Sequence, residues 1–248
     1  MTIFVSCNFT WNESLRDFLE NATNKTNSKA IKREPGDVLW NDGTWSAREE
    51  VLALTALPDG KKPIGVMAFE KDRVPYCMGL AIASDKSWAI SGAMGYNINI
   101  TDLQGDRNGK GLIDGSKALD ILKAACSDYN NDVTNTNYPA WYWAEDFDSN
   151  GVQYKGQSLK GKWYIPTVYE LKMVFDSKSE IDESLARLNT LDRSACTVGS
   201  LVYDVVLSSS QDDASAYAAW YVDFDLGGVH KYSKSSDSSV LVVQAFTY

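Results

Sequence analysis

The fold prediction depends most on one stretch, which reads Trp163-Tyr164-Ile165-Pro166-Thr167-Val168-Tyr169-Glu170-Leu171. Aromatic and branched residues favour a strand before Pro166, and the proline ends it because it has no N–H for a sheet. Thr167 and Glu170 have the spacing of a capping box, in which each side chain accepts a hydrogen bond from the other residue's N–H at a helix N-terminus. We therefore expect a strand followed directly by a helix.

Outward from this stretch, sets of short strands flank a central group of helices. Ser116 predicts the start of one more helix, and the spacing of Ser177 and Glu180 predicts another. Alternation and turn residues predict strands over 37–40, 44–46, 64–69, 80–83 and 88–90 and again near the C-terminus. Helices grouped between strands indicate an α+β fold, because the regular strand–helix alternation of a doubly wound sheet is missing.

The chain divides into two parts on composition. Residues 1–35 are predicted to be an attachment segment, with a β-like run over 3–9, a helix that begins at the Thr10/Glu13 capping box, and a polar linker. Residues 36–248 are predicted to form one binding domain.

Composition and charge exclude several classes of function. The chain has 248 residues, 24 Lys and Arg against 33 Asp and Glu, and a formal net charge of −9. A negative field repels phosphate backbones and anionic lipid, so we expect no nucleic-acid partner and no binding to membrane surfaces. No segment approaches the roughly 20 apolar residues that span a bilayer, so no membrane insertion is expected. The N-terminus lacks a basic start and an apolar signal core, so we expect no standard secretion route through the chain's own sequence.

The sequence has few residues of the kinds that commonly bind metals, act as nucleophiles or hold phosphate groups. His230 is the single histidine, which excludes zinc sites that need two imidazoles. The four cysteines are far apart in sequence, as is typical of small buried residues. Residues 156–162 have the spacing of a phosphate-binding loop, but Trp163 stands where that loop needs Ser or Thr. We expect no cofactor.

An acidic and aromatic segment over 141–151 allows two interpretations. Asp146, Asp148 and Asn150 match the first half of a calcium loop, but Gln157 replaces the bidentate glutamate. A weak metal site is one interpretation, and a polar turn is the preferred one. The carboxylates beside Trp141 and Trp143 are predicted to lie on a solvated acidic loop over a buried tryptophan.

Four motifs in the C-terminal part occur in a fixed order. They are the 163–171 stretch, Leu207-Ser208-Ser209-Ser210-Gln211, Ala219-Trp220-Tyr221-Val222-Asp223-Phe224 and the run from Val240 to Phe246. This order resembles the C-terminal domain family of collagen-like bacterial adhesins, from about residue 105 to 246 and plausibly back to 36. The resemblance implies a C-type lectin-like fold with short antiparallel strands and two to three helices, related to the formylglycine-generating enzyme. The family has aromatic residues where this chain has Val206-Leu207, and arginines where it has Val240–Gln244. Any ligand role that these aromatic residues and arginines have in the family does not carry over to this chain.

Strand periodicity suggests which side chains could contact a ligand. Alternation over 220–225 predicts that Trp220, Val222 and Phe224 are buried and that Tyr221, Asp223 and Asp225 are exposed. Outward positions from 203 to 239 are rich in Tyr, Ser and Asp, the residues that antibody combining sites favour. The alternative is an ordinary solvated sheet edge.

Asparagine usage points to the same region. Fifteen asparagines lie in residues 1–189 and none in residues 190–248. Some C-type lectin-fold proteins that this chain resembles are targets of diversity-generating retroelements, which randomise adenines in Asn codons and yield Tyr, Asp, Ser and His among others. The residues that fit this set are the candidate ligand contacts: Tyr203, Asp204, Asp213, Tyr217, Tyr221, Asp223, Asp225, His230, Tyr232 and Ser236.

These observations predict a binding protein and not an enzyme. The first hypothesis is a phage tail receptor-binding protein at the virion surface, and the second is a bacterial cell-surface adhesin. The expected partners are a host cell-surface protein or glycan and, through residues 1–35, other proteins of the virion or surface structure, with a homo-oligomer left open. The rival is an enzyme, either of the formylglycine-generating type or a glycosidase. The first would need a reactive thiol pair from Cys126 and Cys196.

Overall fold

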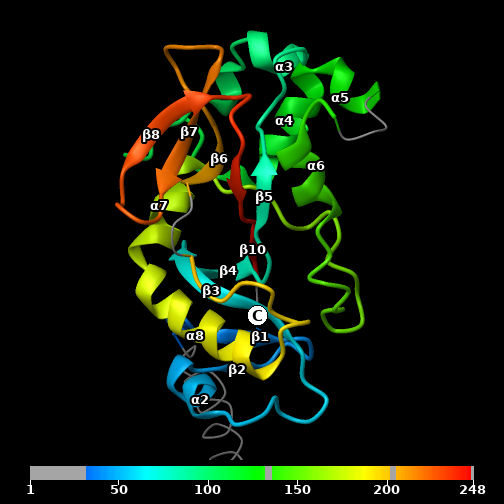
Figure 1. Cartoon of the computed structure of the whole chain (residues 1–248), viewed down its shortest axis with the longest axis vertical. Coiled ribbons are helices and arrows are strands. Elements are labelled where there is room, and N and C mark those ends of the chain that lie inside the picture. Colours follow the sequence, from blue (N-terminus) through cyan, green and yellow to red (C-terminus); the bar gives the residue numbers. More distant parts are fainter. Residues whose placement is uncertain (1–31, 132–135, 202–204, 247–248) are drawn as a thin grey trace, which may run out of the picture. The chain divides into compact units, whose positions relative to one another are not determined.

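Two antiparallel-rich sheets form the framework of the protein (Figure 1). The computed structural model describes residues 32–131, 136–201 and 205–246, and residues 33–248 form one compact unit. The strand and the helix predicted within residues 1–35 lie outside the described residues. In the described part, the first sheet has the order β10 (Val243–Ala245), β4 (Val74–Gly79), β3 (Pro63–Lys71), β1 (Val38–Trp40) and β2 (Trp45–Ser46).

The second sheet has the order β5 (Ala83–Lys86), β9 (Ser238–Val240), β6 (Val205–Gln211), β7 (Ala218–Asp223) and β8 (Val229–Ser233). The pairing of β6 with β9 is parallel, whereas β5–β9, β6–β7 and β7–β8 are antiparallel. β8 is therefore an edge strand, with no described strand on its outer side.

A run of helices lies between the two groups of strands, as the sequence predicts. The run consists of α3 (Met94–Asn97), η1 (Thr101–Leu103), η2 (Gly115–Lys117), α4 (Ala118–Ala125), α5 (Ser127–Asn131), α6 (Pro139–Asp146), α7 (Val168–Asp176) and α8 (Lys178–Leu191), whereas α2 (Arg48–Ala53) lies between β2 and β3. The three predicted helices correspond to α4, α7 and α8, and the α+β class is confirmed. None of the helices in the described ranges combines the length and apolar character that a membrane crossing requires.

The strands at the centre of both sheets are buried on both faces. Neighbouring residues of one strand enter different hydrophobic clusters: Leu39 and Leu207 belong to one, Val38 and Val206 to the other. Helices α4 and α6 cover the first cluster, and α7 and α8 cover the second (Figure 1). The sequence of such a strand is a continuous apolar run without alternation, as in the first seven residues of β3.

Two-sided burial corrects the predicted orientation of β7. Tyr221 was expected to be exposed, but it is completely buried in the same cluster as Leu207, and its hydroxyl donates to the Ser233 carbonyl at 3.1 Å. Val222 and Phe224 are buried in the second cluster, as predicted. Trp220 is only partly buried. The prediction was wrong because alternation identifies an exposed face only where one side of the sheet meets solvent.

Helix α6 replaces the acidic loop predicted after Trp141 as far as Asp146. Pro139 occupies the first helical turn, where its fixed φ and missing N–H are tolerated. Trp141 is buried as expected, but it is held by helix packing, with its ring 5.1 Å from that of Trp88. Two predicted strands are also wrong: residues 80–82 and 88–90 are not in strands, and β4 and β5 flank the first of these segments.

The capping box at the start of α7 is formed as predicted, and it also organises the residues around it. Glu170 is completely buried and accepts hydrogen bonds from Lys71 Nζ at 2.6 Å, Tyr164 Oη at 3.0 Å, Gly115 N at 3.0 Å and Thr167 N at 3.0 Å. Burial is the largest influence on Lys71 and opposes its charge, but the hydrogen bond to Glu170 and the negative charges of Glu170 and Asp114 together outweigh it, so the pKa of Lys71 is raised. One carboxylate thus connects α7 to β3, to η2 and to the stretch before Pro166.

Substituting Glu170 tests how far the fold depends on this carboxylate. We expect Glu170→Gln to lower the free energy of unfolding by about 3–5 kcal/mol, because it removes the buried charge closest to the Lys71 ammonium and leaves only Asp114 Oδ1, at 3.8 Å, as an opposite charge. Urea unfolding of Glu170→Gln, Lys71→Met and the double variant measures this. The double variant should lose less than the sum of the single losses. Strictly additive losses would show that the two charges do not stabilise each other.

Trp163, from the stretch that decided the fold prediction, is buried as expected. Its ring lies 5.4 Å from that of Phe147 and 5.8 Å from that of Phe246, and its Nε1 donates to Ser149 Oγ at 3.0 Å.

We expect Trp163→Ala to lower the free energy of unfolding by about 3–5 kcal/mol, because the substitution leaves a cavity in the core. Trp220→Ala is the matched comparison and should cost clearly less, because that ring is only partly buried. Equal losses in chemical denaturation would contradict this assignment of the core.

Candidate ligand-binding face

The structure places most of the candidate contacts on the β7–β8 hairpin and its flanking loops. Tyr203 and Asp204 lie outside the described residues. Tyr217 and Tyr232 are exposed, with 53% and 43% of their surface accessible. The remaining candidates, apart from the buried Tyr221, are exposed or partly exposed: Asp213, Asp223, Asp225, His230 and Ser236.

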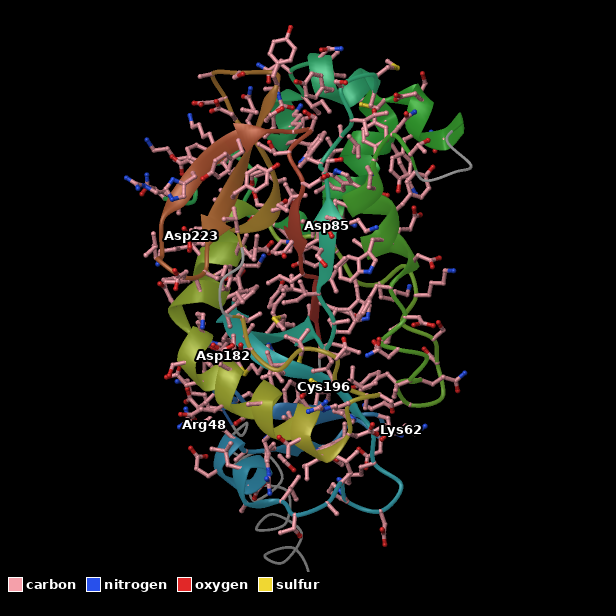
Figure 2. The ribbon with its side chains drawn as sticks, viewed as in Figure 1. Arg48, Lys62, Asp85, Asp182, Cys196 and Asp223 are labelled. Carbon is pink, nitrogen blue, oxygen red and sulfur yellow. The ribbon has the colours of Figure 1, made fainter. Side chains whose placement is uncertain are left out.

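These residues do not form one cluster, because they occupy both ends of the hairpin. Asp223 lies at the end of β7 (Figure 2), where its Oδ1 accepts hydrogen bonds from the N–H groups of Asp225 and Leu226. Its carboxylate therefore closes the β7–β8 turn. Tyr217 precedes β7 at the opposite end, and a strand of six residues separates the two ends by about 20 Å.

At the Tyr217 end, three chain segments meet in what we call the tyrosine–serine surface, defined as Tyr96, Tyr217, Ser233 and Ser235. The rings of Tyr96 and Tyr217 lie 5.5 Å apart at an angle of 59°. Tyr96 Oη is 3.3 Å from Ser233 Oγ, which in turn is 2.9 Å from Ser235 Oγ. Hydrogen bonds from the two serines lower the pKa of Tyr96. The surface carries no formal charge and offers two rings beside a chain of hydroxyl groups.

Tyr96 is the member that the sequence analysis missed. It lies on α3, more than a hundred residues before Tyr217, and α3 is a single turn without a side-chain hydrogen bond at its N-cap. A turn of four residues carries no periodicity that could reveal it. Figure 1 shows α3 and the β6–β7 loop side by side at the upper end of the view, which agrees with the contact between the two rings.

On β8, Lys231 covers a partly buried aromatic ring. Its Nζ lies 4.4 Å from the centroid of the Trp220 ring and 2.5 Å from Asp212 Oδ1, with Asp213 Oδ1 at 3.8 Å. Burial is the largest influence on Asp212 and opposes its charge, but the hydrogen bonds from Lys231 and the Ala214 N–H, together with the positive charge of Lys231, lower the pKa of Asp212. Asp213 also borders a polar pocket of about 290 Å³ with Gln104, Gly105, Asp106, Lys110 and Gly111.

The three weak metal-ligand candidates form bonds within the protein. Asp146 pairs with Lys160 at 2.5 Å, and Asp148 Oδ1 accepts from the Gly151 N–H at 2.9 Å. Asn150 donates from Nδ2 to the Ala195 carbonyl at 3.1 Å. Within residues 32–131, 136–201 and 205–246, no group of three or more His, Cys, Asp or Glu could hold a metal ion. This geometry is that of the polar turn, which was the preferred interpretation.

The described cysteines are free and buried. Cys126 and Cys196 belong to different hydrophobic clusters, and Figure 2 labels Cys196 beside α8. Burial raises the pKa of Cys196 to about 12 and also raises the pKa of Cys126. A thiol must ionise to act as a nucleophile, so these environments disfavour reactivity.

Comparisons with known proteins show a likeness of fold to a solved structure. No protein-family model matches the chain, and neither does any curated protein. Among solved structures, the chain is similar to a fimbrial protein from Bacteroides ovatus ATCC 8483, with a TM-score of 0.59 and 13% sequence identity. The match covers 86% of this chain and 49% of the other, so the chain spans about half the length of that protein. At this identity the likeness is one of fold.

Proposed function

We propose that this chain is a ligand-binding module of a bacterial surface structure, an adhesin that attaches to a protein or glycan on another cell. The fold likeness to a fimbrial protein supports the location at a bacterial surface. Residues 1–35 are proposed to attach the module to other proteins of that structure. No metal or cofactor enters the proposed recognition.

The observation that carries the proposal is the exposure of Tyr217 and Tyr232 on a framework buried from both sides. A tyrosine ring supplies a large contact area with few rotatable bonds, and its hydroxyl can form a hydrogen bond with the partner. The framework is rigid at this point, because β7 packs between β6 and β8 and places Tyr221 and Val222 in two separate clusters. Rigid anchors lose little conformational entropy on binding.

A phage tail receptor-binding protein is the second candidate, and the asparagine distribution favours it. The same aromatic contacts would serve receptor binding at a virion tip. If a retroelement diversifies the candidate contact residues, Tyr221 is not one of them. Tyr221 is completely buried, so substitutions there would disrupt the core and would not change the contacts with a ligand. The adhesin is preferred because the fold likeness is to a fimbrial protein. The C-type lectin-like relationship remains a proposal under either candidate.

The enzyme alternative receives less support from the site. Its nucleophile would have to come from Cys126 and Cys196, whose buried, protonated thiols lie in different clusters. A binding role needs only the exposed groups described above.

Attachment of the full chain to cells and to immobilised glycoproteins tests the proposal. We expect Tyr217→Ala and Tyr232→Ala each to weaken attachment about thirtyfold, which corresponds to about 2 kcal/mol for a tyrosine anchor. Thermal stability should change little, because about half of each tyrosine's surface is exposed and neither residue belongs to the buried core. Leu52→Ala is the control, since it truncates an exposed side chain on α2, away from the hairpin. Attachment that is equal in all four proteins would place the ligand site elsewhere.

A further inference from the structure

A polar pocket lies at the same end of the second sheet as the tyrosine–serine surface. It has a volume of about 290 Å³ and is lined by Gln104, Gly105, Asp106, Lys110, Gly111 and Asp213. Asp213 lies two residues after the end of β6, and Gln211 in β6 pairs with Ala219 near the start of β7. Small-molecule pockets begin at about 300 Å³, so this one suits a single small ring.

The two chain segments that border the pocket continue into the segments that carry the rings of the surface. Asp213 and Tyr217 lie four residues apart on one loop, so their Cα atoms are separated by at most about 14 Å. The other wall follows α3, which carries Tyr96: Asn99 Oδ1 accepts a hydrogen bond from Gln104 Nε2 at 2.7 Å. One extended ligand can therefore contact both the pocket and the tyrosine rings.

Hydrogen bonds within the protein fix the walls of the pocket. Asp106 Oδ1 accepts from the N–H groups of Asn108 at 2.8 Å and Lys110 at 2.9 Å. The bond from Lys110 is the main cause of the lowered pKa of Asp106, so this carboxylate stays charged. A Cβ on Gly111 would lie 2.1 Å from the Gln104 carbonyl oxygen, so only glycine lets the two sides of the hairpin approach this closely. Walls that are already ordered lose little entropy on binding.

The polar groups of the pocket match a ligand whose hydroxyl groups both donate and accept hydrogen bonds. The carboxylates of Asp106 and Asp213 accept, the ammonium of Lys110 donates, and the amide of Gln104 does both. A sugar ring carries hydroxyl groups of this kind around its rim. These four groups include two negative charges and one positive charge, and the whole chain has a formal charge of −9. An acidic sugar is therefore disfavoured, and a neutral one is favoured.

The tyrosine–serine surface supplies what the next sugar of a glycan needs. A sugar ring has an apolar face of C–H groups, which packs on an aromatic ring, while its hydroxyl groups reach neighbouring polar side chains. The rings of Tyr96 and Tyr217 lie 5.5 Å apart, and the hydroxyl groups of Ser233 and Ser235 lie 2.9 Å apart. The surface thus combines aromatic area with hydroxyl groups and carries no formal charge.

A basic side chain from a protein partner is the competing occupant of the pocket. The ammonium of Lys110 would repel it. The Asp213 carboxylate also already has a cation nearby, since Lys231 Nζ lies 3.8 Å from its Oδ1. A neutral ring with hydroxyl groups meets no such repulsion, so the charges favour a glycan over a basic protein segment.

We propose that the pocket holds one neutral sugar ring of a cell-surface glycan, and that the tyrosine–serine surface packs against the next sugars of the same chain. Hydrogen bonds from the carboxylates, the amide and the ammonium hold the first ring without a metal ion. The glycan's place on a cell surface rests on the proposed function, whereas binding of the sugar itself does not.

Binding of the full chain to immobilised oligosaccharides tests the proposal. The probes end in mannose, glucose or galactose, and each is compared with its sialylated counterpart. We expect at least one neutral probe to bind more tightly than its sialylated form, and equally well with and without EDTA. Binding to sialylated probes alone, loss of binding in EDTA, or no binding to any probe would overturn the proposal.

Substitutions at the pocket measure the contribution of its charged groups. We expect Asp213→Ala and Lys110→Ala each to weaken binding of the neutral probe about tenfold, the effect of losing one hydrogen bond to a charged group. Asp59→Ala and Lys62→Ala are the matched controls, because each removes the same charge from an exposed residue in another region (Figure 2 labels Lys62). Equal binding by all four variants would place the sugar elsewhere.

NMR of the unmodified protein locates the sugar even if a variant fails to fold. We expect the methyl glycoside of the bound sugar to shift the amide signals of Gly105 and Gly111. The longer oligosaccharide should shift these and also the ring signals of Tyr96 and Tyr217. Glycine signals that stay unmoved by a bound oligosaccharide would overturn the proposal.

Attachment to cells separates this inference from the proposed function. If attachment persists after enzymatic removal of surface glycans but still requires Tyr217, the ligand is a protein, and the proposed function stands while the sugar site fails. If the sugar occupies the pocket but Asp213→Ala and Lys110→Ala leave attachment unchanged, the sugar site stands and its role in attachment fails.

Discussion

The buried carboxylate of Glu170 is the interaction on which the rest of the arrangement depends. It completes the capping box of α7 and accepts hydrogen bonds from β3, from η2 and from Tyr164. A buried charge of this kind is tolerated only when its partners satisfy it, so α7 cannot shift along the sheet without losing several bonds at once. Since α7 covers one face of β6 and β7, the position of the hairpin follows from that of Glu170.

Two-sided burial then determines where a ligand can bind. Strands whose neighbouring residues enter two separate clusters have no free face, so contacts are left to strand ends, to loops and to the edge strand β8. Tyr217 and Tyr232 occupy such places. The tyrosine–serine surface is assembled from three segments at one strand end. The buried Lys234 joins them, because its Nζ donates to the Gly95 carbonyl on α3 and its N–H donates to the Tyr217 carbonyl.

The sequence predicted the elements whose signals are local. The Thr167/Glu170 capping box, the helices α4, α7 and α8 and the burial of Trp163 are confirmed. Tyr221 was placed on the wrong side because alternation contains no information on whether a helix covers the second face. Helix α6 was missed although Pro139 suited its first turn, and Tyr96 was missed because only tertiary packing brings it to Tyr217. Local signals thus predicted much of the framework, whereas the composite surface required long-range contacts.

The alternation of neighbouring residues between two clusters also bears on how the protein melts. Val38 and Leu39, or Val206 and Leu207, lie next to each other in the chain but support different clusters, so neither cluster can come apart while the shared strands stay in place. Residues 33–248 should therefore lose structure in one cooperative transition, with equal calorimetric and van't Hoff enthalpies. A protein built in this way resists partial opening, so a force applied at one point acts on a unit that unfolds as a whole.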